Sequence, residues 1–136
     1  MISWMANVDA AGILVKLGDL ILLGRRSKVC ESLSGYWAIP GGAIESNEQP
    51  RDAAIREFLE ETDIEINKEI SYLTSFPTPS GGTFFVYFTE VQDLIFPSAD
   101  AKDAFEHDEW GFFKIQKNCL PTPITKETIK AILMTK

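Results

Sequence analysis

The sequence predicts an α/β or α+β sandwich, in which helices pack against a β-sheet. Short apolar segments bounded by glycine and proline are typical of strands, and several of them follow one another along the chain. Two longer segments without internal glycine are typical of helices. The 136 residues with 45% hydrophobic content suffice for one core, so a single domain spanning residues 1–136 is expected.

The first strands are predicted to form a hairpin. Residues 10–15 and 20–23 are apolar, and Gly18 and Asp19 between them suit the turn of a hairpin. Residues 25–35 are polar and end in a glycine, which predicts a loop.

The next segment predicts a strand, a turn and a helix. Residues 36–39 are apolar and are followed by Pro40-Gly41-Gly42, which indicates a tight turn. Residues 50–62 contain no glycine, and Pro50 suits the first turn of a helix because its missing N–H has no partner there. Further along, the same criteria predict strands at 64–66, 70–76, 83–91 and 110–115, and the strands at 70–76 and 83–91 flank a predicted loop at 77–82 and suit a second hairpin. They also predict a polar surface loop at 97–108 and a second helix at 125–134.

Charge and cysteine content exclude several classes of partner. The net charge is −7, and broad binding to nucleic acid polymers or anionic membranes requires clustered basic residues, so neither partner is expected. Cys30 and Cys119 belong to no Cys/His cluster, which predicts two ordinary thiols. The first residues contain no basic leader, and no apolar run approaches the roughly 20 residues of a membrane span. The expected location is the cytoplasm.

The predicted helix at residues 50–62 places its charges on one face. On a helical wheel of about 100° per residue, Arg56, Glu57, Glu60 and Glu61 share that face. The opposite face, expected to dock onto the sheet, consists of Ala54, Ile55, Phe58 and Leu59. Three carboxylates at this spacing repel one another, and a hard divalent cation such as Mg²⁺ offsets such repulsion. The alternative is a solvated acidic face on which Arg56 pairs with Glu60.

The segment ahead of this helix completes a specific pattern. Gly41 and Gly42 allow the backbone to approach a bound ion or phosphate. From Gly42 the chain runs through five residues to Glu48, through seven more, and then reads Arg-Glu-Phe-Leu-Glu-Glu-Thr-Asp-Ile. This order closely resembles the Nudix box, GX5EX7REUXEEXGU, in which U is a bulky apolar residue. The one departure is Asp63 in place of the second glycine, where a left-handed backbone is common and Asp tolerates it at modest cost.

The resemblance to the Nudix family implies a fold and a set of functional residues. The implied fold is an α/β/α sandwich around a mixed sheet. The implied ligands of Mg²⁺ or Mn²⁺ are the side chains of Glu57, Glu60 and Glu61 and the carbonyl of Gly41. Arg56 is expected to orient the carboxylates, Glu48 to brace the loop against the helix, and Gly42 to lie against the substrate.

The family reaction is attack by water on one phosphorus of a nucleoside diphosphate derivative. A nucleoside triphosphate is the first expected substrate, and the alternative enzyme class hydrolyses ADP-ribose or nucleotide sugars. Pro79 lies fifteen residues after Ile64, a spacing similar to a marker of ADP-ribose hydrolases. A third interpretation is a non-catalytic nucleotide-binding sensor, which only Asp63 favours. In each case the partner is a small nucleotide, and a homodimer is left open as the assembly.

The general base has three candidates, Glu57, Glu106 and Glu109. Glu109 is favoured because it precedes the run Trp-Gly-Phe-Phe, which resembles the family's glutamate before an aromatic strand. The alternative is that residues 106–109 form a solvated acidic loop, with His107 at the surface.

Two arginines at a strand end are candidates for substrate binding. Arg25 and Arg26 are expected to end the second strand of the hairpin, and guanidinium groups match the geometry of phosphates. The alternative is that both are solvent-facing charges. Aromatic residues in the predicted strands include candidates for base stacking, although most strand aromatics belong to a core.

Overall fold

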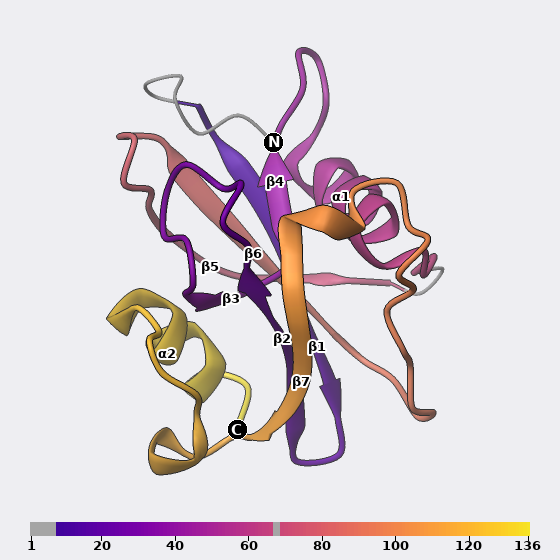
Figure 1. Ribbon diagram of the computed structural model, residues 1–136, viewed down its shortest axis with the longest axis vertical. Helices are drawn as coiled ribbons and strands as arrows, with labels where there is room; N and C mark the ends of the chain where they lie inside the picture. Colours follow the sequence, from indigo (N-terminus) through magenta and orange to yellow (C-terminus); the bar gives the residue numbers. More distant parts are fainter. Residues whose placement is uncertain (1–7, 67–68) are drawn as a thin grey trace.

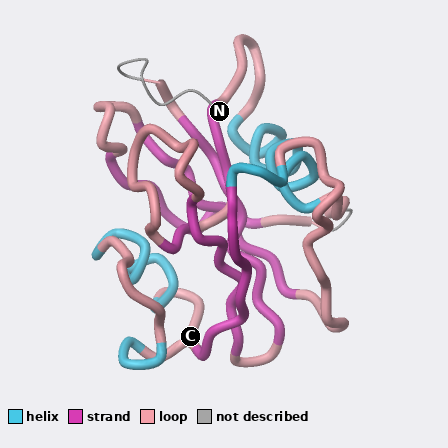
Figure 2. The backbone as a smooth tube through the Cα atoms, in the orientation of Figure 1, coloured by secondary structure: helices cyan, strands magenta, loops and turns pink. Residues whose placement is uncertain are grey.

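The computed structural model describes residues 8–66 and 69–136, and within them seven strands form one mixed sheet with a helix on each face (Figure 1, Figure 2). In chain order the elements are β1 (Ala10–Leu17), β2 (Leu20–Arg26), β3 (Trp37–Ala38), β4 (Gly41–Ala43), α1 (Pro50–Thr62), β5 (Ser71–Pro77), β6 (Thr83–Glu90), the 3₁₀ turn η1 (Ala104–Glu106), β7 (His107–Lys114), the 3₁₀ turn η2 (Lys117–Cys119) and α2 (Lys126–Leu133). The predicted α/β sandwich around a mixed sheet is confirmed.

Strand β1 occupies the centre of the sheet. It pairs antiparallel with β2 and with β4, and parallel with β6, while β6 pairs antiparallel with β5. Strand β2 pairs antiparallel with β3 and β7. The two predicted hairpins are therefore present, and the strand order β3-β2-β1-β6-β5 supplies the pairing that periodicity alone could not fix.

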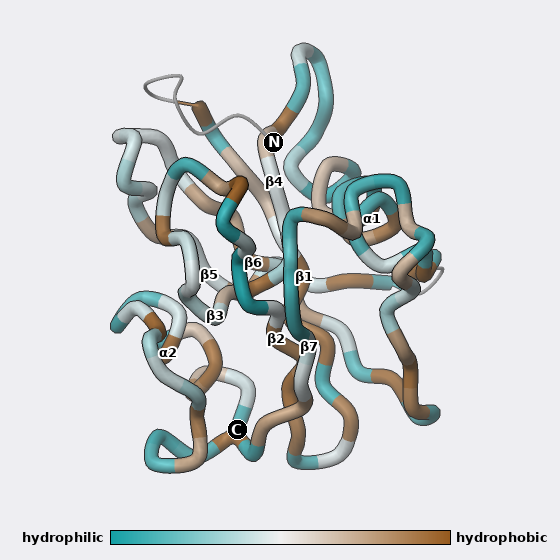
Figure 3. The backbone as a smooth tube through the Cα atoms, viewed as in Figure 1, coloured by the Kyte–Doolittle hydropathy of each residue, from teal (hydrophilic) through white to brown (hydrophobic). Residues whose placement is uncertain are grey.

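Helices α1 and α2 cover opposite faces of the sheet, so β1 is buried on both sides (Figure 1). Ile13 and Val15 pack with Phe58 of α1, whereas Leu14 packs with Ile132 of α2; all five side chains are fully buried. Successive residues of a strand face opposite sides, and because both sides of β1 are covered its residues 10–15 carry no polar side chain (Figure 3). Truncation of Phe58 to alanine would cost about 3–5 kcal/mol.

Helix α1 has the bounds that the sequence predicts. Pro50 stands in its first turn, and the helix ends at Asp63, whose φ of 63° and ψ of 25° lie in the left-handed region. The N–H of Asp63 donates to the carbonyl of Leu59 at 2.8 Å. This is the conformation expected at the position of the missing box glycine. Helix α2 begins after Thr125, whose hydroxyl accepts from the N–H of Thr128 at 3.2 Å.

Three predictions about the segments between these elements were wrong. Gly41 and Gly42 do not form a tight turn, because they continue as β4 alongside β1. Residues 64–66 do not form a strand, since the left-handed Asp63 turns the chain and the N–H of Ile64 donates to the hydroxyl of Thr62 at 3.1 Å. The polar segment 97–108 is not wholly a surface loop, because its end forms η1 and the start of β7.

Strand β2 ends at Arg26, which confirms the expectation that Arg25 and Arg26 end this strand and contradicts the prediction of a loop over residues 25–35. An irregularity in its pairing with β7 lies between Arg25 and Arg26. The polar loop therefore starts after Arg26. Neither helix in the described part of the chain is long and apolar enough to cross a membrane.

Candidate active site

Strand β4 brings two glycines against β1 and α1. A side chain at Gly41 would overlap the carbonyl oxygen of Ala11 on β1. A side chain at Gly42 would overlap the carboxylate of Glu57 on α1. Glycine is therefore required at both positions by close approach rather than by a turn, and only the backbone of Gly42 stands beside the Glu57 carboxylate.

Two of the three helix carboxylates are buried, which contradicts the alternative of a solvated acidic face. Glu57 is 4% exposed and Glu61 is 0% exposed, while Leu59, assigned to the docking face, is 38% exposed. The physical reason is that α1 contacts β4 and η1 as well as β1, so the carboxylate side is also covered. The helical wheel located the carboxylates on one face correctly but could not show what lies opposite that face.

Arg56 links the loop before α1 to the helix. Its guanidinium donates to both carboxylate oxygens of Glu48, at 2.8 and 2.9 Å, and to the carbonyl of Ala43 at 3.0 Å. It also donates to Glu57 at 3.0 Å and to Glu60 at 3.1 Å. The hydrogen bond from Arg56 is the main cause that lowers the pKa of Glu48. This network includes the predicted Arg56–Glu60 pair, but it is mostly buried rather than a solvated surface.

The buried carboxylates have free oxygens. Within residues 8–66 and 69–136, Oε1 of Glu57 and both carboxylate oxygens of Glu61 have no hydrogen-bond partner. Burial raises the pKa of Glu57 to about 7, although Arg56 acts in the opposite direction. Burial, followed by the charges of Glu57 and Glu106, raises the pKa of Glu61 well above its ordinary value. An uncompensated buried carboxylate is unfavourable, so both groups favour either a proton or a cation.

The donor set fits a hard divalent cation in its chemistry. Carboxylate and carbonyl oxygens are the ligands that Mg²⁺ and Mn²⁺ prefer, and the free oxygens of Glu57 and Glu61 are of this kind. No three acidic, histidine or cysteine side chains among the described residues form a ready-made metal cage. In this arrangement the guanidinium of Arg56 already engages one oxygen each of Glu57 and Glu60.

The structure separates the candidate bases Glu106 and Glu109. Glu106 is buried on η1, which contacts α1, and its charge contributes to the raised pKa of Glu61, after burial and Glu57. Glu109 lies opposite Arg25 in the β2–β7 pairing, and its exposed carboxylate is 3.2 Å from the guanidinium. Glu57 and Glu106 therefore share one acidic region, and Glu109 lies apart from it.

His107 is buried, so the prediction of a surface histidine was wrong. Its ring lies 4.6 Å from that of Trp110 and covers the position where a side chain on Gly24 would stand. The first residues of β7 pair with the end of β2, and this pairing draws His107 inward. Strand alternation traced back from Trp110 would place Asp108, not His107, on the side of Trp110, so no pattern in the sequence indicates this contact.

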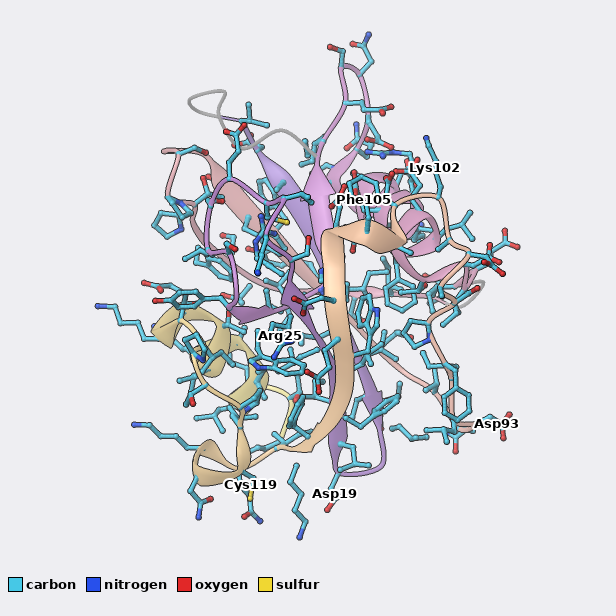
Figure 4. The ribbon with its side chains drawn as sticks, viewed as in Figure 1. Asp19, Arg25, Asp93, Lys102, Phe105 and Cys119 are labelled. Atoms are coloured by element: carbon cyan, nitrogen blue, oxygen red, sulfur yellow. The ribbon has the colours of Figure 1, made fainter. Side chains whose placement is uncertain are left out.

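Arg25 and Arg26 face different surroundings. Arg25 pairs with Asp108 at 2.7 Å, and its guanidinium lies over the ring of Trp37 at 5.8 Å from the centroid. Arg26 donates to the carbonyl of Ser32 at 2.9 Å, and its charge acts on the pKa of Glu61 as a lesser cause, after burial and the nearby carboxylates. Figure 4 shows Arg25 on the side of β7 that faces α2, whereas Lys102 and Phe105 lie beside α1. Of the two arginines, only Arg26 is near the acidic region.

The sequence analysis did not find Lys102. Its ammonium lies 3.6 Å from a carboxylate oxygen of Glu60, and the neighbouring N–H of Asp103 donates to the Glu60 carbonyl at 2.7 Å. The lysine side chain is mostly exposed, and an exposed pair of this kind contributes little to stability. No local pattern in the sequence indicates this contact.

A cavity of about 350 Å³ adjoins the glycines of β4. It lies between β4, the β5–β6 loop and the first turn of α2, and its walls are mainly apolar. The lining includes Arg26, Gly41, Gly42, Phe84, Pro79 and Glu127. Because Gly42 lines the cavity and also contacts Glu57, the cavity and the carboxylates are separated by one stretch of backbone.

Comparisons with known proteins agree with this geometry. The MutT NUDIX hydrolase of Burkholderia pseudomallei has a similar fold, with a TM-score of 0.78 at 22% identity over 95% of this chain and 98% of that chain. The RNA pyrophosphohydrolase of Bartonella henselae is 42% identical over 66 residues, 43% of this chain and 38% of its own length. The 8-oxo-dGTP diphosphatase of Proteus vulgaris is 32% identical over 59 residues, 43% of this chain and 52% of its own length.

The matched segments span at most about half the length of these curated relatives, whereas the match to the family as a whole is longer. The profile of the NUDIX domain matches residues 6–133, which include the box, the sheet and both helices. The chain therefore belongs to the Nudix hydrolase family, with a MutT-like fold.

Proposed function

We propose that this protein hydrolyses the diphosphate linkage of a nucleoside diphosphate derivative, with a nucleoside triphosphate as its first substrate. The supporting observation is the pair of buried carboxylates with free oxygens, Glu57 and Glu61, beside a cavity bounded by Gly42. A bound cation would stabilise the negative charge of these buried carboxylates. The partly matched relatives named RNA pyrophosphohydrolase and 8-oxo-dGTP diphosphatase support an activity on nucleotides.

The proposed metal ligands come from β4 and α1. They are the carbonyl of Gly41 and the carboxylates of Glu57, Glu60 and Glu61. When bound, Mg²⁺ or Mn²⁺ would offset the negative charge of the phosphates and assist the attack by water. Family members generally use divalent cations, which agrees with this donor set.

The chain's own side chains are proposed to position the reactants. Arg56 holds Glu48, Glu57 and Glu60 in one network and so fixes the carboxylates relative to β4. Gly42 leaves room for the carboxylate of Glu57 to lie against β4, and its backbone, which lines the cavity, is proposed to contact the substrate. Arg26 lines the cavity and is proposed to bind phosphate.

The general base is proposed to come from the buried acidic region. Glu57 and Glu106 belong to that region, and burial raises the pKa of each carboxyl, which suits a group that accepts a proton near neutral pH. Glu109 forms an exposed ion pair with Arg25. The assignment of Glu109 as base, and of Arg25 as a phosphate ligand, therefore has less support than the assignment of Glu106 and Arg26.

A second candidate substrate is ADP-ribose or a nucleotide sugar. The observation that favours it is the position of Pro79, which lines the cavity. A longer group beyond the diphosphate would extend along the β5–β6 loop. The non-catalytic sensor is disfavoured because every carboxylate of the box is retained.

The test is a hydrolysis panel with and without a chelator. Formation of the nucleoside monophosphate would be measured from nucleoside triphosphates, ADP-ribose and nucleotide sugars in the presence of Mg²⁺ or Mn²⁺. We expect turnover of a nucleotide that stops after exhaustive treatment with EDTA and returns when the cation is restored. Undiminished turnover after chelation would refute the metal assignment, and nucleotide binding without turnover of any substrate would indicate a sensor.

A further inference from the structure

The cavity is charged at only two positions. Of the described residues that line it, Arg26 and Glu127 alone carry charge. Arg26 ends β2 near the acidic region, whereas Glu127 lies in the first turn of α2, the helix on the opposite face of the sheet from α1 (Figure 1). A nucleotide whose phosphates approach Arg26 and Gly42 would therefore place its other end toward Glu127.

The carboxylate of Glu127 is a free acceptor. The neighbouring hydroxyls of Thr125 and Thr128 bond to each other at 2.9 Å, and those of Thr78 and Ser80 lie 3.1 Å apart. No hydrogen bond or ion pair joins Glu127 to any other residue of the ranges 8–66 and 69–136. Glu127 therefore presents both carboxylate oxygens without a competing partner from the described chain.

The cavity also contains a flat aromatic surface. Phe84 lines it and stacks on Phe76, with ring centroids 5.2 Å apart and planes 4° from parallel. A planar base stacks well on such a ring, and an apolar cavity of about 350 Å³ is within the usual range for a small ligand. The cavity thus offers a stacking surface together with a single anionic acceptor.

We propose that Glu127 determines base specificity and selects guanine nucleotides, an inference that rests on the proposed function. A carboxylate accepts two parallel N–H bonds, and the Watson–Crick edge of guanine presents adjacent donors at N1 and N2. Adenine and cytosine place a ring acceptor beside their amine, and thymine has one N–H between two carbonyls. Guanine and 8-oxoguanine share the edge with two donors, so Glu127 reads both.

The first experiment compares dGTP, 8-oxo-dGTP, dATP and dCTP by steady-state kinetics. The protein should favour both guanine substrates by roughly 100-fold or more in kcat/KM, because the other bases do not offer the Glu127 carboxylate two adjacent N–H donors. Glu127→Gln should lose most of that preference through KM rather than kcat. It should also improve dATP, since an amide offers the acceptor and donor that match the edge of adenine. The control is Glu65→Gln, the same substitution at an exposed residue outside the cavity lining. It should change neither the guanine preference nor the turnover of dATP.

A binding measurement separates this inference from the proposed hydrolysis. Isothermal titration with dGMP and dAMP should show selective binding of dGMP by the wild type and loss of that selectivity in Glu127→Gln. Selective binding without turnover of any nucleotide would refute the hydrolysis and retain the role of Glu127. Turnover without base preference would overturn the role of Glu127 and retain the hydrolysis.

One further outcome would also overturn the assignment. An acidic residue in the first turn of a helix stabilises that turn through the helix dipole. If Glu127→Gln lowers only the melting temperature and keeps the guanine preference, Glu127 is a structural residue.

Discussion

His107 couples the stability of the fold to pH. The side chain is 8% exposed, and its Nδ1 has no hydrogen-bond partner among the described residues. Burial lowers the pKa of His107 from 6.5 to about 4, and the charge of Arg26 acts in the same direction. Between these two pKa values the unfolded chain binds a proton at this position and the folded protein does not.

The sign and size of the effect follow from that difference. Because the folded pKa is depressed, the contribution of neutral His107 to stability is complete above pH 6.5 and is lost as the pH falls toward 4. Over the whole interval the loss is about 3 kcal/mol, and by pH 4.5 it is about 2.5 kcal/mol. His107→Gln keeps a polar side chain that is neutral at every pH, so the variant should lack this loss.

Urea unfolding of the metal-free wild type and of His107→Gln at pH 7.5 and 4.5 tests this reasoning. The variant should be less stable than the wild type at pH 7.5, because the contact with Trp110 is lost. The difference in the free energy of unfolding should shrink or reverse by about 2.5 kcal/mol at pH 4.5. Buried carboxylates titrate in both proteins, so their contribution cancels. A difference that stays the same at the two pH values would refute the neutral buried state of His107.

Three other substitutions test the site. Glu61→Gln removes a fully buried charge, so it should raise the free energy of unfolding of the metal-free protein at pH 8 by on the order of 2 kcal/mol. Its activity should fall roughly 100-fold or more. A variant with near-full activity at limiting Mg²⁺ would exclude Glu61 as a ligand. Asp63→Gly should raise stability by about 0.5–1 kcal/mol, since glycine adopts the left-handed backbone without strain, and a clear decrease in melting temperature would show that Asp63 has a role of its own. If Glu106 is the base, Glu106→Gln should lower kcat by roughly 100-fold, whereas the kcat of Glu109→Gln should stay within about threefold of the wild-type value. A larger loss of kcat in Glu109→Gln than in Glu106→Gln would restore Glu109 as the candidate base.

Much of the fold follows from local signals in the sequence. Helix α1 has the predicted bounds because Pro50 favours its start and a residue in the left-handed region ends it at Asp63. The two hairpins follow from apolar runs that flank turn residues. Strand β4 could not be predicted in this way, because Gly41 and Gly42 have a strong local preference for turns and become a strand only by pairing with β1.

The sequence identified the acidic residues of the candidate site more accurately than it predicted their burial. The box located Glu57 and Glu61, yet charged side chains on a helical wheel suggest solvent, and their burial depends on β4 and η1. The preference for Glu109 rested on its position before an aromatic run, whereas the geometry places Glu106 beside the acidic region through η1. Such contacts join segments about 50 residues apart in sequence, and no local pattern encodes them.

The single stretch of backbone at Gly42 has a thermodynamic consequence. A nucleotide in the cavity and a cation at Glu57 would stand on opposite sides of the same peptide groups, close enough for the charge of each to act on the other. Their binding equilibria are then coupled, and the coupling is reciprocal: whatever factor the cation adds to the affinity for the nucleotide, the nucleotide must add to the affinity for the cation. A protein of this design would retain its metal weakly while free and tightly while it holds substrate.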